Sequence, residues 1–189
     1  PPLEGEFPVG TREFVLHVCM IERDDSTSCP ATDILIQAWY PAMVADEPLA
    51  PYIMNSDRAV PAIAERSGAP EFMVRKIAEM ETNARLNAAL SPARKHYPLL
   101  LFSHGYHSLR MQNTALLEQL ASDGNIVFSI QHSYDAMTTI MPNGKVIDSM
   151  APVPENKSID EDDAIRGSWT NRRIGEVRAV LADLGDAPK

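Results

Sequence analysis

The residues best placed to do chemistry follow an apolar run in the middle of the chain. Residues 97–102 form that run, and Ser103, His104, Gly105 and Tyr106 come directly after it. A glycine after a buried strand lets the backbone turn sharply, so that the next amide can face a site and stabilise a developing oxyanion. The backbone N–H of Tyr106 is then the candidate donor, and Gly105 is the turn that supports it. A plain strand-to-helix turn would have the same sequence.

Other polar residues near this turn are weaker candidates. His104 and His107 have a spacing that metal ligands can adopt, but no third ligand is nearby, so we expect no metal. His132 ends the next apolar run, where catalytic groups of open sheets gather, although a hydrogen-bonded histidine is the simpler interpretation. We expect His104 and His132 at most to contact substrate. Ser108 and Ser133 lack the strained turn that activates a nucleophilic serine.

The glycine positions exclude several well-known motifs. The nine glycines are at positions 5, 10, 68, 105, 124, 144, 167, 175 and 185. No two are closer than five residues, which rules out the Gly-x-Gly of a dinucleotide fingerprint. Gly5 and Gly10 have P-loop spacing, but Thr11 stands where the phosphate-binding lysine should be. The same arithmetic excludes the nucleophile elbow Gly-x-Ser-x-Gly.

Length and composition favour one globular domain. With 189 residues, of which 44% are hydrophobic, the chain can bury a core and is not disordered as a whole. Its formal net charge of −9 argues against a nucleic-acid partner. No apolar run approaches the ~20 residues of a membrane helix. The first residues do not resemble a signal peptide. A mature chain from which a signal peptide had been removed would look the same.

The cysteines leave two alternatives open. Cys19 and Cys29 could close a disulfide across a hairpin, or both could be buried thiols. The chain has no Cys-x-x-Cys and no His-Glu-x-x-His, so a zinc site has no support. No metal or organic cofactor is expected.

The elements before the candidate turn begin with a predicted hairpin. Apolar segments 13–21 and 34–40 are joined by a polar turn, which indicates two antiparallel strands. A long connection at 42–96 contains helical pieces at 61–67 and from residue 70 onward, then an irregular passage at 83–92. The second helix is expected to carry an imperfect apolar stripe, which consists of Phe72, Ile77 and Met80 and extends to Met73 and Ala84.

The elements around the turn predict a parallel sheet. Strand 97–102, helix 111–122 and strand 125–130 form a βαβ crossover, with 97–102 buried on both faces. A polar connection with an Asn143-Gly144 turn follows, and its acidic run at 159–163 is either a solvated face or a helix start. A last helix at 170–184 ends at Gly185. Because another buried strand should come next, the predicted sheet is unfinished.

Five segments, in order along the chain, resemble the platelet-activating-factor acetylhydrolase family of α/β hydrolases. Residues 97–105 (YPLLLFSHG) are similar to its "YPxxxFSHG" segment. Residues 120–127 (LASDGNIV) are similar to "LASHGYVV", and residues 130–136 (IQHSYDA) to "IDHxYxA". Residues 8–12 with 38–42 resemble the start of such proteins, and residues 172–184 resemble the helix before the nucleophile strand.

The resemblance implies an α/β-hydrolase fold. Residues 1–189 would be the N-terminal part of one domain, with the helical and irregular connection at 42–96 and a sheet completed by residues not in this chain. The family carries its Gly-His-Ser-x-Gly-Gly elbow, and then the Asp and His of its triad, on later elements that this sequence does not contain. Only the oxyanion amide of Tyr106 carries over, while the Tyr106 side chain is a candidate for lining an acyl pocket.

The expected function is therefore part of a serine-dependent carboxylic ester hydrolase. Its substrate would be an ester or a phospholipid, and this chain alone would be inactive. Its partner would be the C-terminal half of the same hydrolase, either in one polypeptide or as a separate chain. The family and the potential Cys19–Cys29 disulfide favour a secreted or periplasmic location. The alternative is a non-catalytic, hydrolase-like binding or regulatory module.

Overall fold

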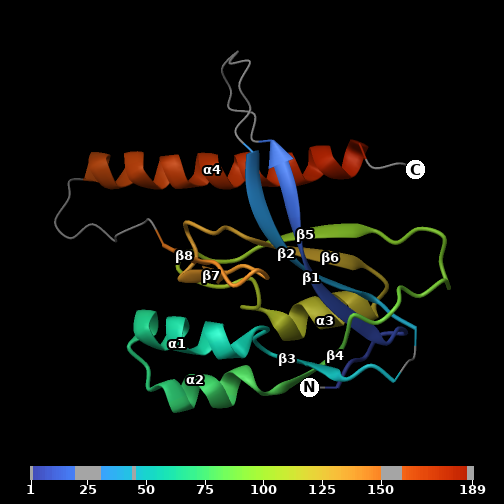
Figure 1. Cartoon of the computed structure of the whole chain (residues 1–189). Coiled ribbons are helices and arrows are strands. Elements are labelled where there is room, and N and C mark those ends of the chain that lie inside the picture. Colours follow the sequence, from blue (N-terminus) through green and yellow to red (C-terminus); the bar gives the residue numbers. More distant parts are fainter. Residues whose placement is uncertain (1, 20–30, 44–45, 150–158, 187–189) are drawn as a thin grey trace.

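The computed structural model describes residues 2–19, 31–43, 46–149 and 159–186. Their strands and helices are arranged around one main sheet (Figure 1). The strands are β1 (Val9–Cys19), β2 (Ala31–Pro41), β3 (Leu49–Pro51), β4 (Glu81–Leu86), β5 (Leu99–Ser103), β6 (Ile126–Gln131), β7 (Thr138–Ile140) and β8 (Val146–Asp148). The helices are α1 (Ser56–Ser67), α2 (Glu71–Ala78), α3 (Thr114–Ser122) and α4 (Ile159–Asp186).

The main sheet has the order β3-β4-β1-β2-β6-β5. β1 and β2 pair antiparallel without a register break, from Val9 opposite Pro41 to Cys19 opposite Ala31. β5 and β6 pair parallel and are joined through α3. The predicted hairpin and βαβ crossover are therefore both confirmed, and the sheet is mixed because β6 also pairs antiparallel with β2.

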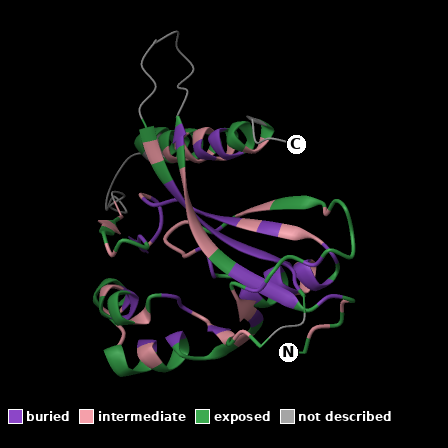
Figure 2. Ribbon diagram, turned by 45° about the vertical axis from the view of Figure 1, so that its right-hand side comes forward, coloured by how far each residue is buried: buried purple, intermediate pink, exposed green. Residues whose placement is uncertain are grey.

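Helices cover both faces of the sheet because its central strands are apolar on both sides. On one face, Trp39 of β2 packs with Leu117 of α3. On the other face, Ile34 and Ile36 of β2 pack with Val180 of α4. Trp39 has an odd number and Ile34 and Ile36 have even numbers, as expected for residues on opposite faces of one strand. Buried residues accordingly follow the central strands (Figure 2).

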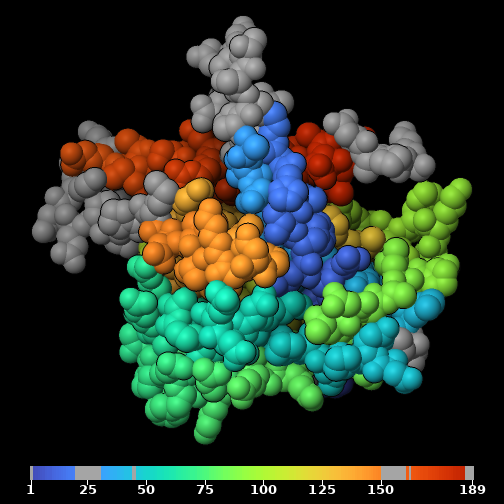
Figure 3. Space-filling model, viewed as in Figure 1, coloured from blue at the N-terminus to red at the C-terminus, as the bar shows by residue number. Residues whose placement is uncertain are grey.

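Four short strands within the connections were not predicted: β3, β4, β7 and β8. β4 runs through the segment expected to be irregular and pairs with β1 and β3. β7 and β8 form a hairpin whose turn is the predicted Asn143-Gly144, with Gly144 at φ 84°. In the space-filling view this hairpin (orange) lies between α4 and α1 (Figure 3), and Ile140 of β7 belongs to the apolar cluster of α1 and α2.

The structure corrects the predicted burial of β5 and α2. Leu99 and Leu100 of β5 are 38% and 36% exposed, because β5 has only β6 as a hydrogen-bonded neighbour in the described sheet. In α2, Phe72 and Ile77 are exposed, as is Met80 just after the helix, and the small side chains of Val74 and Ala78 are buried instead. These small residues allow α2 to pack closely on α1.

Several boundaries also differ from the prediction. α1 begins five residues before Pro61 and contains it, and α3 begins at Thr114. α4 begins at Ile159, so the acidic run is a helix start, and the helix extends to Asp186. Cys19 is disulfide-bonded, which favours the disulfide alternative, and Cys29 lies outside the described residues. Within the ranges described, no helix combines the length and apolarity needed to cross a membrane.

Candidate active site

The candidate turn lies at the C-terminal end of β5. The Ser108 N–H donates to the Gly105 carbonyl at 3.1 Å and closes a four-residue turn in which Tyr106 is the second residue. His107, the third residue, has φ 54°, in the left-handed region that non-glycine residues rarely adopt. Such backbone outliers cluster at functional sites, so the geometry motivates a functional hypothesis for this turn.

Both backbone polar groups of Gly105 are held. Its N–H donates to Gln112 Oε1 at 2.8 Å, and its carbonyl also accepts a hydrogen bond from His104 Nδ1 at 2.7 Å. A Cβ at this position would come 3.3 Å from Gln112 Oε1, so the close approach suits glycine. The residue that the sequence singled out as a turn therefore sits in a rigid hydrogen-bonded setting.

His104 is buried and neutral. Its side chain is 1% exposed, and its Nε2 accepts the backbone N–H of His132 at 3.1 Å. Since Nε2 accepts, the ring proton is on Nδ1 and donates to Gly105. Burial lowers the pKa of His104 to about 4, and the nearby His132 and Arg173 act in the same direction. His104 is therefore a buried ring whose two nitrogens are both hydrogen-bonded.

We expect this histidine to make stability fall in mild acid. The pKa of His104 is about 4 in the folded chain, against 6.5 when unfolded, so the unfolded state binds more protons between these values. The free energy of unfolding should fall by about 3 kcal/mol as the pH drops from above 6.5 to below 4. Urea unfolding across this pH range measures the change.

The matched variants are His104→Asn and His96→Asn, because His96 is exposed. His104→Asn should remove most of this pH dependence relative to the parent chain, whereas His96→Asn should leave it in place. Equal slopes in all three proteins would refute the assignment.

His132 forms the centre of a Ser-His-Glu arrangement that the sequence did not reveal. Its Nδ1 contacts the carboxylate of Glu176 on α4, and its Nε2 lies 3.0 Å from Ser103 Oγ. His132 and Glu176 are both buried. The serines considered from sequence, Ser108 and Ser133, are not the partners of His132 among the described hydrogen bonds. Glu176 was missed because 44 residues separate it from His132.

Arg173 ties the same helix to the turn. Its Nη1 donates to the His104 carbonyl at 2.8 Å, and its Nε donates to Asp135 Oδ2 at 2.9 Å. Arg172 Nη1 lies 3.7 Å from the other oxygen of this buried carboxylate. The Asp135 carbonyl in turn accepts the His107 N–H at 3.0 Å.

The Tyr106 side chain stacks on Trp169 of α4, with ring centroids 4.5 Å apart and planes 10° apart. The His107 ring lies nearly perpendicular to the Tyr106 ring, with ring centroids also 4.5 Å apart. Burial raises the pKa of the Tyr106 phenol above its ordinary value. The Tyr106 ring is therefore held between two other aromatic rings.

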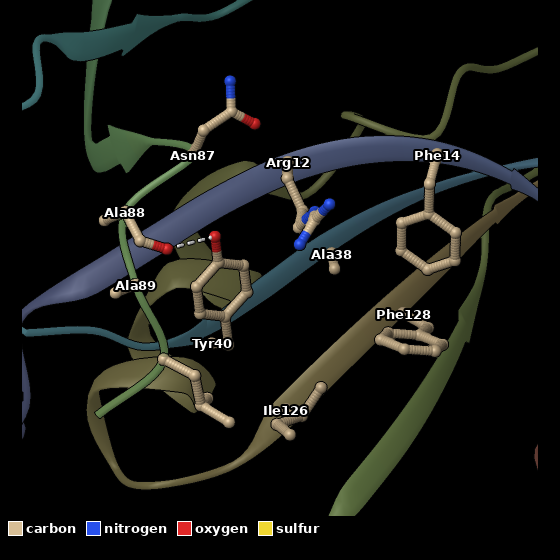
Figure 4. Close-up of a pocket in the computed structure, with 10 residues that line it drawn as sticks. Arg12, Phe14, Ala38, Tyr40, Asn87, Ala88, Ala89, Ile126 and Phe128 are labelled. Atoms are coloured by element: carbon tan, nitrogen blue, oxygen red, sulfur yellow. Dashed lines mark hydrogen bonds between the residues drawn. The ribbon is translucent and has the colours of Figure 1, made fainter. Parts of the chain in front are cut away.

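A separate hollow of about 620 Å³ lies along β1, β2 and β6 (Figure 4). Its lining includes Arg12, Phe128 and Tyr40, whose hydroxyl donates to the Ala88 carbonyl at 2.8 Å. Phe128 is in the first half of β6, whereas His132 follows its last residue, so the hollow is not at the candidate turn. Over the described ranges, no group of three His, Cys, Asp or Glu side chains could hold a metal ion.

A mixed sheet with a parallel βαβ unit, and a glycine turn at the carboxyl end of β5, fits the α/β-hydrolase class. Within that class, the chain belongs to the family "Platelet-activating factor acetylhydrolase, isoform II", whose sequence model matches residues 1–185. The family resemblance and the fold class expected from the sequence are thus confirmed.

Individual relatives agree with this assignment. Platelet-activating factor acetylhydrolase of Cavia porcellus is 31% identical over 101 residues, which are 51% of this chain and 23% of the relative. The protein of the same name from Gallus gallus is 30% identical over 79 residues, which are 42% of this chain and 18% of the relative.

Among solved structures, a ferulic acid esterase from Streptomyces cinnamoneus matches with a TM-score of 0.69 and 25% identity. The alignment covers 95% of this chain and 47% of the esterase. The chain therefore spans about half of that solved relative, and its matches cover less than a quarter of the curated ones. It is a member of a hydrolase family.

Proposed function

We propose that this chain supplies one side of the active site of a serine-dependent carboxylic ester hydrolase. The observation that carries the proposal is the Gly105–Ser108 turn at the carboxyl end of β5, with both backbone groups of Gly105 held. The backbone N–H of Tyr106 is the proposed oxyanion donor. Its side chain, stacked on Trp169, would line the acyl pocket.

In the proposed reaction, a serine hydroxyl attacks the ester carbonyl while a histidine takes the hydroxyl proton. The carbonyl oxygen becomes an oxyanion, which the Tyr106 N–H and a second backbone amide stabilise. Loss of the alcohol leaves an acyl-enzyme, and water then releases the acid. Because the sequence contains no Gly-x-Ser-x-Gly, we assign the Ser-Asp-His triad to residues outside this chain.

Ser103 is not the proposed nucleophile, although His132 is beside it. Ser103 is the last residue of β5 and is still paired with Ile130 of β6, so it does not lie on the strained turn that presents a nucleophilic serine. The substrate class is a carboxylic ester, either a small ester or a phospholipid, as the names of the acetylhydrolase and ferulic acid esterase relatives support.

The alternative function is a non-catalytic hydrolase-like module that binds a ligand or a partner. The lack of a nucleophile elbow in the sequence favours it. The two functions differ in whether a polypeptide that carries the elbow works together with this chain.

A serine-directed fluorophosphonate probe, followed by denaturing intact-mass analysis, tests the proposal. We expect the 20.9 kDa chain alone to remain unlabelled and to hydrolyse p-nitrophenyl acetate only at the background rate. The probe should label a polypeptide with Gly-x-Ser-x-Gly that contains or accompanies this chain. An adduct on Ser103 would contradict the triad assignment, and failure to label any such polypeptide would favour the binding module.

A further inference from the structure

We propose that His104 sets the orientation of the Gly105–Tyr106 peptide plane, and that α4 holds His104 in place through Arg173 and Glu176. These three are positioning residues, because each acts on the candidate oxyanion donor through another group. The inference rests on the proposed function for its catalytic consequence only, since the positioning itself can be measured on the chain.

The first step concerns the geometry of the peptide bond. The Gly105 carbonyl and the Tyr106 N–H belong to one planar trans unit, so fixing the carbonyl direction fixes the opposite direction for the N–H. His104 Nδ1 donates to that carbonyl at 2.7 Å, and the Ser108 N–H donates to it at 3.1 Å. Rotation of this peptide plane would therefore break two hydrogen bonds.

The second step concerns what holds the His104 ring. Its Nε2 accepts the backbone N–H of His132 at 3.1 Å, which fixes both the tautomer and the ring plane. Its backbone carbonyl accepts Arg173 Nη1 at 2.8 Å. The side chain and the main chain of His104 are thus held by different elements, β6 and α4.

The third step concerns the end of β6. The His132 backbone that donates to His104 carries a ring whose Nδ1 contacts the Glu176 carboxylate, and both side chains are buried. Ser103 at the end of β5 contacts the opposite ring nitrogen at 3.0 Å. Glu176 therefore fixes the His132 ring relative to α4, and Ser103 fixes the same ring relative to β5.

Arg173 and Glu176 are three residues apart on α4, so they lie on one face of the helix. Arg173 donates directly to the His104 carbonyl. Glu176 contacts the ring of His132, whose backbone N–H donates to the His104 ring. We infer that the docking of α4, rather than the β5 strand by itself, determines where the Tyr106 amide points.

Selective ¹⁵N-tyrosine labelling of the 189-residue chain gives a direct test, because it contains five tyrosines and hence five amide signals. Tyr106→Phe assigns the Tyr106 signal by its disappearance. Glu176→Gln should move or broaden the Tyr106 signal and leave those of Tyr40 and Tyr97 in place. Glu176→Asp, which keeps the carboxylate, should bring the Tyr106 signal back toward its original position.

Arg173→Lys is the second variant, and it is useful if Glu176→Gln does not fold. It should move the same signal, because Lys cannot reproduce the guanidinium contacts with both the His104 carbonyl and Asp135. Asp183→Asn and Arg178→Lys are matched controls on exposed positions of α4, and they should leave the Tyr106 signal unchanged. An unmoved Tyr106 signal in folded Glu176→Gln or folded Arg173→Lys would overturn the proposal.

A kinetic measurement connects the positioning to catalysis. In the ester-hydrolysing protein that contains this chain, Glu176→Gln should lower kcat for p-nitrophenyl acetate about 10²-fold with little change in KM, as misplacement of a catalytic group does. Partial recovery of kcat in Glu176→Asp would distinguish positioning from general destabilisation. A moved Tyr106 signal with unchanged kcat would refute the oxyanion role of Tyr106 and leave the positioning intact.

Discussion

Tyr106→Pro should lower kcat for ester hydrolysis about 10²–10³-fold in the protein that completes this active site. Proline removes the backbone N–H at residue 106, which is the proposed oxyanion donor, and leaves the rest of the turn's sequence unchanged. Because the oxyanion exists in the transition state and not in the bound ester, KM should change little. Steady-state kinetics with p-nitrophenyl acetate measure both constants.

Tyr106→Ala is the matched comparison for this variant. It also removes the ring that stacks on Trp169, but it keeps the backbone N–H. The ratio of kcat between Tyr106→Ala and Tyr106→Pro therefore isolates the amide, and thermal unfolding of both variants checks that each is folded. If the two folded variants had the same kcat, the Tyr106 amide would not be an oxyanion donor.

Glu13→Gln should reduce the free energy of unfolding by about 3–5 kcal/mol. Arg110 Nε donates to Glu13 Oε1 at 2.9 Å, and the two side chains are only 4% and 7% exposed. A neutral glutamine leaves the buried guanidinium without a countercharge. The loss should be visible in urea unfolding, because Arg110 also fixes the segment before α3, where its N–H donates to Gln131 Oε1 at 3.0 Å.

Glu6→Gln provides the surface counterpart of this experiment. Glu6 Oε2 lies 3.1 Å from Arg94 Nη2, but the two side chains are 75% and 44% exposed. Loss of this ion pair should lower the free energy of unfolding by less than about 1 kcal/mol, since water and salt screen exposed pairs. Similar losses for both variants would mean that burial does not govern these ion pairs.

The fold could be predicted where local sequence and final environment agree. The β1–β2 hairpin and the β5–α3–β6 crossover have apolar patterns that match their buried central positions. α2 illustrates the opposite case: its large side chains Phe72 and Ile77 are exposed, whereas Val74 and Ala78 are buried. Periodicity identifies a helix, but the packing partner decides which face is covered.

Of the candidate site, only the turn that directly follows β5 could be predicted from the sequence. The strand followed by His104-Gly105-Tyr106 indicated the turn, and the structure places the turn at the end of β5. Ser103, Arg173 and Glu176 were not identified, because their roles depend on contacts between segments that are far apart in sequence. The one available signal was the position of Glu176, three and four residues before the apolar Ala179 and Val180 of α4, since a Glu on a buried face needs a polar partner.

The position of β6 has a consequence for how the chain is made. β6 lies between β2 and β5, yet it follows β5 in the sequence. The apolar strand β5 therefore leaves the ribosome with no described partner available, whereas β2 can pair with β1 as soon as it emerges. At about 5–20 residues per second, synthesis of residues 104–125 takes roughly one to four seconds. During that interval β5 is a natural binding segment for chaperones that recognise extended apolar peptides.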